Sequence, residues 1–181
     1  MTFLEKKKAS ILGYLKDPQF LLYFWVLLCA VASFKQYAIS DLSAGKCAYN
    51  NFRIFIQSFE HLINHQTLYG VYPYEYFDLY HYGPLFALLI APFYYFPIPL
   101  SLTLWGAFNG WALFKAIWAL PLNNPAKAAI IWISANTLVT ATLNSQFHAI
   151  CVAMIIFSYI YSARGKEWLG TLFMILGVFI K

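Results

Sequence analysis

The chain has 181 residues, of which 61% are hydrophobic, 20% aromatic and only 10% charged. A soluble domain usually carries about 25% charged residues because its surface faces water. Too few charges are therefore present to cover a soluble surface, and the composition predicts an integral membrane protein of the all-α class. The net charge of +5 comes mostly from scattered basic residues and does not indicate a nucleic-acid partner.

The first 18 residues are predicted to be a basic tail that precedes the first long apolar run, residues 19–36. Lys6, Lys7 and Lys8 cluster in this tail, and basic residues beside a span favour the cytoplasmic side. We therefore expect a multi-pass protein of the plasma (inner) membrane with a cytoplasmic N-terminus. A cleavable signal peptide is the alternative, since Ala30-Val31-Ala32 has the small-x-small form of a cleavage site.

Several apolar segments follow in chain order. A spanning helix needs about 20 mostly apolar residues. Five segments approach that length: residues 19–36, 83–99, 100–121, 127–143 and 146–163. A sixth begins near Trp168 and is still apolar at Ile180, just before the final Lys181. Residues 83–181 are thus predicted to hold about five further membrane segments, as the N-terminal piece of a longer polytopic protein.

The long polar stretch at residues 37–82 is predicted to be an extracytoplasmic loop. It holds four of the seven acids and three of the four histidines: Asp41, Glu60, Glu75, Asp78, His61, His65 and His81. Apolar side chains recur in it at three- and four-residue steps: Phe52, Phe55, Ile56, Phe59, Leu62 and Ile63. This spacing predicts an amphipathic helix, with Ser58 and His61 among the residues of its polar side. We expect that helix to lie in the membrane interface, apolar face down.

The basic residues after the fifth segment conflict with this topology. If all five segments cross fully, Arg164 and Lys166 reach the outside, against the positive-inside preference. Either one segment is a re-entrant hairpin or the local charge is overridden. The segment at 83–99 is one suspect, because it is short and broken by Pro92.

A series of short motifs becomes informative when read in order. They are Asn51-Phe52-Arg53-Ile54-Phe55, Leu68-Tyr69-Gly70, Tyr82-Gly83-Pro84, a helix with Trp105 and Asn109, Ser145-Gln146-Phe147-His148, and a last helix closing in Ile180-Lys181. The series resembles the N-terminal half of glycosyltransferase family 87, polytopic enzymes of the GT-C superfamily. There the motifs resemble D-x-x-x-Y, L-Y, Y-x-P-P, G-Q-x-N and I-K-P. The resemblance covers roughly residues 45–181, and the order and spacing carry it, since each motif is only two to five residues long.

The resemblance implies a GT-C-like helix bundle that transfers a hexose, with inversion, from a polyprenyl-phosphate donor to an acceptor outside the cytoplasm. It also implies an acidic residue early in the first outer loop, but Asn51 stands at that position. A carboxamide cannot accept the acceptor's proton as a carboxylate does. We therefore predict Asp78 as the base and Asn51 as a residue that positions the acceptor. The alternatives are Asp41, Glu60 or Glu75 as the base, or an inactive relative.

The donor phosphate is predicted to contact Arg53, Gln146, His148 and Lys181, with Tyr82 in a tyrosine-rich wall beside the sugar. Of the family's G-Q-x-N motif only Gln146 matches, because Ser145 replaces glycine and His148 replaces asparagine. The competing interpretations are structural. Arg53 can pair with lipid headgroups, the Gln146 and His148 side chains can join helices, and the tyrosines can form an interfacial belt.

The predicted function is thus a membrane hexosyltransferase whose partners are membrane lipid and a lipid-linked sugar. A transporter component and a non-catalytic scaffold are the alternatives. The sequence predicts no metal site: Cys29, Cys47 and Cys151 are far apart and fit no CxxC pattern. It defines neither the sugar nor the acceptor nor any metal requirement.

Overall fold

The computed structural model describes residues 13–180. These residues fold into helices without a β-strand. The basic cluster at Lys6–Lys8 and the C-terminal Lys181 lie outside the described residues. The predicted all-α class is confirmed. The helices are α2 (Pro18–Ala38), α3 (Asn50–Ile63), α4 (Pro84–Leu89), α5 (Ala91–Tyr94), α6 (Ile98–Ala119), α7 (Asn124–Leu143), α8 (His148–Ala163) and α9 (Glu167–Ile180).

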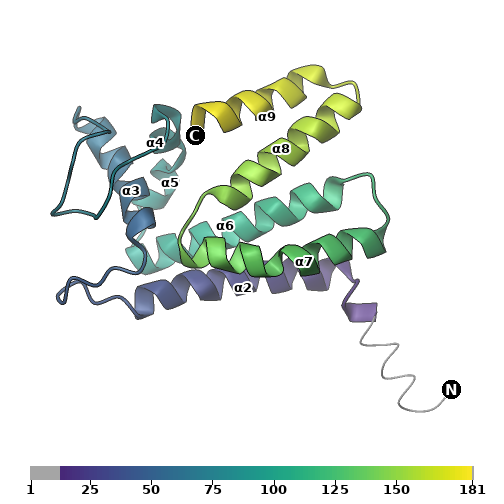
Figure 1. Cartoon of the computed structure of the whole chain (residues 1–181), viewed down its shortest axis with the longest axis horizontal. Helices are drawn as coiled ribbons and strands as arrows, with labels where there is room; N and C mark the ends of the chain where they lie inside the picture. Colours follow the sequence, from purple (N-terminus) through teal and green to yellow (C-terminus); the bar gives the residue numbers. More distant parts are fainter. Residues whose placement is uncertain (1–12, 181) are drawn as a thin grey trace, which may run out of the picture.

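The long helices form one bundle, and the short ones gather at one end of it (Figure 1). Helices α2, α6 and α7 lie side by side, α8 packs on α6, and α9 folds back along α8. Two described helices, α2 and α7, are long and apolar enough to cross a membrane by length and composition. Helix α6 has 22 residues, which corresponds to about 33 Å, and α8 and α9 are shorter apolar helices.

Residues 83–99 do not form a continuous helix. Helix α4 has six residues and α5 has four, so neither is longer than about 9 Å. Pro92 lies in the first turn of α5, where its missing N–H costs little, and it cannot continue α4. Both short helices pack on α3 at the same end of the bundle, so this segment turns back where it began.

The contact between α2 and α6 depends on two glycines spaced four residues apart. A Cβ built on Gly106 would lie 2.1 Å from the Ser33 Oγ and 2.7 Å from the Cys29 carbonyl oxygen. A Cβ on Gly110 would lie 2.9 Å from the Cys29 Sγ and 3.1 Å from the Trp25 carbonyl oxygen. The two backbones therefore approach as closely as small residues allow, as in the small-xxx-small contacts of membrane helices.

Helix α3 occupies the segment for which the sequence predicts an amphipathic helix, but protein covers its apolar face. Phe55 contacts Phe86 edge-on, with 4.9 Å between ring centroids, and Phe86 contacts Phe147 at 5.0 Å. The polar side is also partly covered: His61, expected among the exposed residues, is only 1% exposed because the loop carrying Tyr72 packs over it. Where α3 lies relative to a membrane stays a prediction.

Candidate functional site

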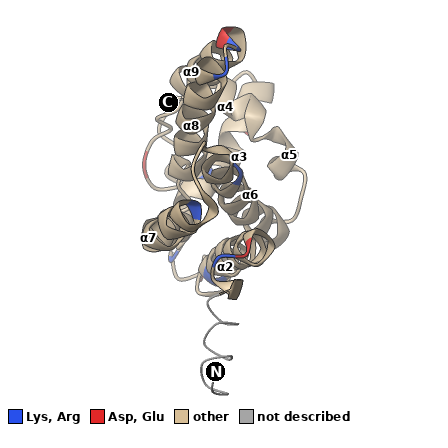
Figure 2. Cartoon of the chain, turned by 90° about the vertical axis from the view of Figure 1, so that its right-hand side faces the viewer, with Lys and Arg blue, Asp and Glu red and all other residues tan. Residues whose placement is uncertain are grey.

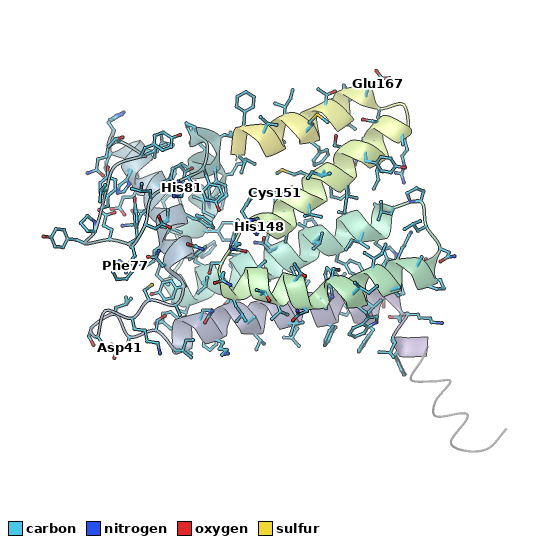
Figure 3. All side chains as sticks on the ribbon, viewed as in Figure 1. Asp41, Phe77, His81, His148, Cys151 and Glu167 are labelled. Atoms are coloured by element: carbon cyan, nitrogen blue, oxygen red, sulfur yellow. The ribbon has the colours of Figure 1, made fainter. Side chains whose placement is uncertain are left out.

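Three segments far apart in the sequence meet around a polar pocket of about 220 Å³ at one end of the bundle. They are the start of α3, the loop before α4 and the turn between α7 and α8. The pocket is lined by Asn51, Ile54, Phe55, Asp78, Leu79, His81, Tyr82, Gln146 and His148. Figure 3 shows the labelled His81 and His148 approaching this region from the loop and from α8. Five of the seven predicted site residues thus line one cavity.

Asn51 lies in the first turn of α3, where its amide joins two parts of the pocket wall. Its Nδ2 donates a hydrogen bond to the carbonyl oxygen of Asn144, over 2.8 Å. The side chain of Gln36, at the end of α2, donates to the neighbouring carbonyl of Leu143. The end of α7 is therefore fixed by two side-chain amides. A carboxylate at position 51 could not make its bond, because it has no hydrogen to donate.

Asp78 has a strained backbone, with a φ of +98°. Non-glycine residues rarely adopt such angles, and where they do, the surrounding structure has to enforce them. Its Oδ1 accepts a 2.8 Å hydrogen bond from the Leu79 N–H and lies 3.5 Å from the His81 Nε2. The side chain is 66% exposed. The carboxylate is therefore held at the pocket but remains open to a substrate.

Asn50 supplies the contact that fixes this strained segment, and sequence reasoning missed it. Its Oδ1 accepts from the N–H of Phe77 over 2.8 Å, and its Nδ2 donates to the Phe77 carbonyl oxygen over 2.5 Å. One side chain thus holds both polar groups of the residue that precedes Asp78. Only its position next to Asn51 in the sequence could have drawn attention to it.

Tyr82 forms an apolar wall with a polar tip. Its ring stacks on Phe86 at 4.8 Å and meets Phe55 edge-on at 5.1 Å. Burial, and to a smaller extent the nearby Cys151, raises the pKa of Tyr82 to about 12. The phenol is therefore neutral across the physiological range and retains its proton as a donor.

Gln146 and His148 lie at the turn into α8. The Gln146 Oε1 and the His148 Nδ1 are 2.9 Å apart, which is a hydrogen-bond distance. Ser145 adopts a φ of +51°, which turns the chain between α7 and α8. Because α8 begins at His148, the backbone N–H groups of its first turn point toward the pocket end of the helix.

The other candidates lie elsewhere. Arg53 lines a separate cavity of about 140 Å³ together with Glu75. Asp41 closes a turn of its own, and its pKa is lowered by hydrogen bonds from Ser43. Glu60 does not line the pocket. The pocket thus contains one of the four carboxylates that the sequence left open, Asp78.

Glu75 has a partner that the sequence did not reveal. Its Oε2 lies 2.8 Å from the Nε2 of the buried His61, whose ring stacks on Tyr72 with 3.8 Å between centroids. This cluster attaches the tyrosine-rich loop to α3. Helical spacing alone could not predict it, because the loop that buries His61 is distant from α3 in sequence.

The C-terminal end of α9 also lies near the pocket. The Gly83 N–H donates a 2.9 Å hydrogen bond to the Ile180 carbonyl oxygen, and a Cβ on Gly83 would lie 1.9 Å from the Phe179 carbonyl oxygen. Only a glycine fits here, directly after Tyr82. Lys181, predicted to contact phosphate, follows Ile180 but lies outside the described residues.

Comparison with known sequences identifies the family. The profile of glycosyltransferase family 87 matches residues 80–181, which is more than half of the chain. The chain belongs to glycosyltransferase family 87. The match includes Tyr82, Gln146 and His148 but begins after Asn51, Arg53 and Asp78. No curated protein and no solved structure gives a significant match.

Membership of family 87 makes the chain a membrane glycosyltransferase, and it favours the enzyme over a transporter or a scaffold. The pocket is smaller than the about 300–1,000 Å³ typical of sites for drug-sized ligands, so it suits a single sugar ring or a phosphate group. Among residues 13–180, no group of three or more His, Cys, Asp or Glu side chains is arranged to hold a metal ion.

Proposed function

We propose that this protein transfers a hexose from a polyprenyl-phosphate sugar to an acceptor hydroxyl on the extracytoplasmic side of the membrane. One observation carries the proposal: a single pocket gathers Asn51, Asp78, Tyr82, Gln146 and His148 from three distant segments. The family resemblance selects Asn51, Tyr82, Gln146 and His148 in sequence, and their meeting with Asp78 in one pocket supports the proposal. The pocket offers a carboxylate, neutral hydrogen-bond donors and a helix start, which are the groups that glycosyl transfer from a phosphate requires.

The proposed reaction is a single displacement at the anomeric carbon of the donor. The acceptor oxygen forms the new bond to that carbon while the bond to the phosphate oxygen breaks. The polyprenyl phosphate leaves with the electron pair, and the Asp78 carboxylate takes the hydroxyl proton. The Asp78 Oδ1 already accepts from Leu79, so Oδ2 is the oxygen available for this proton. A positioned base of this kind contributes about 10²–10⁴-fold to the rate.

The leaving phosphate gains negative charge, and the start of α8 can stabilise it. Helix N-termini favour anions because their first N–H groups are unsatisfied and carry the positive end of the helix dipole. The side chains of Gln146 and His148 flank this start within the pocket. Asn51 and Tyr82 then orient the acceptor and the sugar on the opposite walls.

The charge distribution supports an outward-facing pocket. Among residues 13–180, one end of the bundle carries five basic and two acidic side chains: Lys16, Lys115, Lys127, Arg164, Lys166, Asp17 and Glu167. Figure 2 looks onto this end and shows blue at the start of α7 and at the turn between α8 and α9. Among the same described residues, the pocket end carries three basic side chains and four acidic ones: Lys35, Lys46, Arg53, Asp41, Glu60, Glu75 and Asp78. Positive residues favour the cytoplasm, so the pocket end faces outward.

This orientation also removes the conflict over Arg164 and Lys166. If α4 and α5 turn back at the outer surface instead of crossing, α6 runs inward, α7 outward and α8 inward. The turn that carries Arg164 and Lys166 then faces the cytoplasm, as the basic residues prefer. The re-entrant alternative for residues 83–99 is therefore the topology that we propose.

The test is transfer from a radiolabelled polyprenyl-phosphate hexose by the full chain in membranes. Asp78→Asn is expected to lower kcat by about 10²–10⁴-fold, because it removes the base and keeps the shape. Asp41→Asn is the matched control: it removes an acid from the same loop, outside the pocket, and is expected to retain wild-type turnover. Equal activity in both variants would contradict the assignment of Asp78, and no transfer from any lipid-phosphate sugar would contradict the proposed function.

Asn51→Asp tests whether the base belongs at position 78, as proposed, or at position 51, where the family has an acid. It restores the residue type of the family at that position but loses the hydrogen bond to the Asn144 carbonyl. We expect transfer to fall, because the carboxylate and the carbonyl oxygen repel each other across 2.8 Å. Higher activity in Asn51→Asp than in the wild type would show that position 51 is the proper place for the base.

A further inference from the structure

Helix α7 buries one face and, among residues 13–180, leaves the opposite face exposed. Its buried residues pack toward α2, α6 and α8: Ala128, Ile131, Leu138, Ala141 and Thr142. Figure 2 shows α7 at the edge of the bundle. The exposed residues on the opposite side lie within about 60° of one another around the helix axis. We call them the outer face of α7, and they are Ala129, Ile133, Asn136 and Thr140.

The outer face contains one side chain that does not suit lipid. Helix α7 is long and apolar enough to cross a membrane, and Ile133 is 80% exposed, as a lipid-facing residue can be. The Asn136 carboxamide, by contrast, has two N–H donors and an acceptor oxygen. Among residues 13–180 this side chain makes no hydrogen bond, whereas the Thr140 hydroxyl donates to the Asn136 backbone carbonyl over 3.0 Å.

Asn136 lies too deep along α7 for its side chain to reach water. It stands seven residues before Leu143 and twelve after Asn124, which corresponds to about 10 Å and about 18 Å from the two ends of the helix. The hydrocarbon core of a bilayer is about 30 Å thick. Lysine and arginine reach the interface through their long side chains, but asparagine has a single methylene. The carboxamide therefore needs a partner from another membrane helix.

We propose that the outer face of α7 pairs with the same face of a second copy of this chain, as a parallel dimer in the membrane. The carboxamide of Asn136 is self-complementary, because its N–H can donate to the oxygen of the second copy and accept in return around a two-fold axis. Both copies insert in the same orientation, so Asn136 lies at the same depth in each. A helix of another kind would need a polar group at that depth.

The spacing of the outer face supports such a pairing. Its residues follow one another at steps of four, three and four: Ala129, Ile133, Asn136 and Thr140. This is the spacing at which two helices pack along a left-handed seam, and membrane helices commonly cross in this way. A single polar residue in such a seam fixes the register of the two helices. The small side chains of Ala129 and Thr140 on either side allow the helices to approach closely.

The proposed dimer leaves the candidate active site accessible. No residue of the outer face lines the polar pocket, and none lines the cavity between α7 and α8. The inference rests on the membrane character of α7 and goes beyond the proposed reaction. Loss of pairing and loss of sugar transfer are therefore separate results.

Two neighbouring substitutions on α7 provide a matched pair. Asn136→Leu removes the carboxamide from the outer face, whereas Thr137→Leu removes a polar group one residue further along, where α7 lines the cavity shared with α8. Both positions are exposed in the single chain. Each variant would be labelled with one fluorophore as full chain, placed in lipid vesicles at a series of protein-to-lipid ratios, and counted by single-molecule photobleaching.

We expect the wild type to dimerise and Asn136→Leu to raise the dissociation constant by about 5–30-fold, as loss of an interhelical hydrogen bond in a membrane does in model helices. Thr137→Leu should match the wild type, and both variants should keep the wild-type rate of sugar transfer per chain. A wild type that is monomeric at every ratio would overturn the proposal. Equal weakening by both substitutions would also overturn it, because the contact would then not depend on the outer face.

Crosslinking in membranes tests the same contact without removing a side chain that folding needs. Around a two-fold axis, residues of the seam meet their own copies, so Asn136→Cys should form a covalent dimer on mild oxidation. Ile155→Cys on α8 is the control, and the wild type, with Cys29, Cys47 and Cys151, sets the background. Crosslinking of Ile155→Cys but not of Asn136→Cys would place the contact elsewhere. A monomeric wild type whose unfolding midpoint falls in Asn136→Leu would show that a segment of the same chain covers this face.

Discussion

Helices α2 and α6 meet across a tightly packed contact, whereas α7 and α8 are separated by an open groove. In the first contact Gly106 and Gly110 bring two backbones together, and Ser33 is fully buried. In the second, Val152 and Thr137 stay exposed along a cavity that begins at His148. Neighbouring pairs of helices in one small bundle thus follow opposite packing rules. We call the contact between α2 and α6 the closed side and the groove between α7 and α8 the open side. The closed side can serve as a rigid support, while the open side leaves room for a ligand beside the polar residues.

The largest expected effect comes from enlarging a residue on the closed side. Gly106→Leu places a side chain where even a Cβ would lie 2.7 Å from the backbone oxygen of Cys29. Because the backbone has to move, we expect the protein to lose about 1–3 kcal/mol of stability or fail to fold. The measurement is the midpoint of thermal unfolding in detergent, with intrinsic fluorescence as the signal.

Thr137→Leu is the control on the open side. It adds apolar volume to the groove, where a larger side chain has space, so the midpoint should stay close to that of the wild type. Equal destabilisation by Gly106→Leu and Thr137→Leu would show that the groove closes in the folded protein, and the contrast between the two helix pairs would be lost.

The next effect concerns the wall of the pocket, beside the mouth of the groove. Asn50→Ala removes both hydrogen bonds to Phe77 and releases the strained Asp78. With about 1 kcal/mol for each bond, kcat should fall by about 10–30-fold. A lost positioning residue should lower kcat with little change in KM for the donor, whereas general unfolding would lower the amount of folded protein. A normal kcat would show that the φ of Asp78 does not depend on Asn50.

The residues selected from the sequence include much of the pocket lining but little of the packing around it. Asn51, Tyr82, Gln146 and His148 could be selected because short motifs keep their order even when single residues change, whereas Asp78 was selected as a carboxylate of the same polar loop. The burial of His61 could not be predicted, since helical spacing does not tell which loop will cover a polar face. Arg53 lies on α3, as expected, but lines a different cavity.

The closed side could in part have been predicted. Gly106 and Gly110 form a small-xxx-small pattern that is visible in the sequence, although its partner helix is not. The open groove, by contrast, results from the relative positions of α7 and α8. Their apolar residues are equally typical of packed and lipid-facing surfaces, so composition cannot distinguish the two.

A smaller effect is expected from Tyr82→Phe, which removes one hydroxyl from the pocket and keeps its aromatic wall. We expect transfer to fall about fivefold, the value of one hydrogen bond of about 1 kcal/mol. Because burial raises the pKa of Tyr82 to about 12, its phenol stays protonated throughout the assay range. The pH–rate profiles of the variant and the wild type between pH 5 and pH 10 should therefore have the same shape. If one limb of the pH–rate profile disappeared in Tyr82→Phe, the role of Tyr82 as a neutral hydrogen-bond donor would be contradicted.

The smallest effect concerns the coupling of two residues on the closed side. The Ser33 Oγ is buried without a hydrogen-bond partner among residues 13–180, and it is the atom nearest to a Cβ on Gly106, at 2.1 Å. Ser33→Ala alone should be close to neutral or slightly stabilising, because no hydrogen bond is lost and an unpaired hydroxyl leaves the interior. Gly106→Ala alone should be destabilising, since its methyl group meets this oxygen.

Combining the two substitutions tests whether atomic contact determines the closed side. The double variant removes the nearest atom, so Gly106→Ala should cost less in the Ser33→Ala background, with a coupling of about 0.5–1 kcal/mol. The rescue should be incomplete, because the Cys29 carbonyl oxygen still lies 2.7 Å from the new Cβ and belongs to the backbone. Additive unfolding midpoints would mean that α2 and α6 adjust freely to one another. The closed side would then be no more rigid than the groove, and packing alone could not explain why the ligand-sized space lies beside α8.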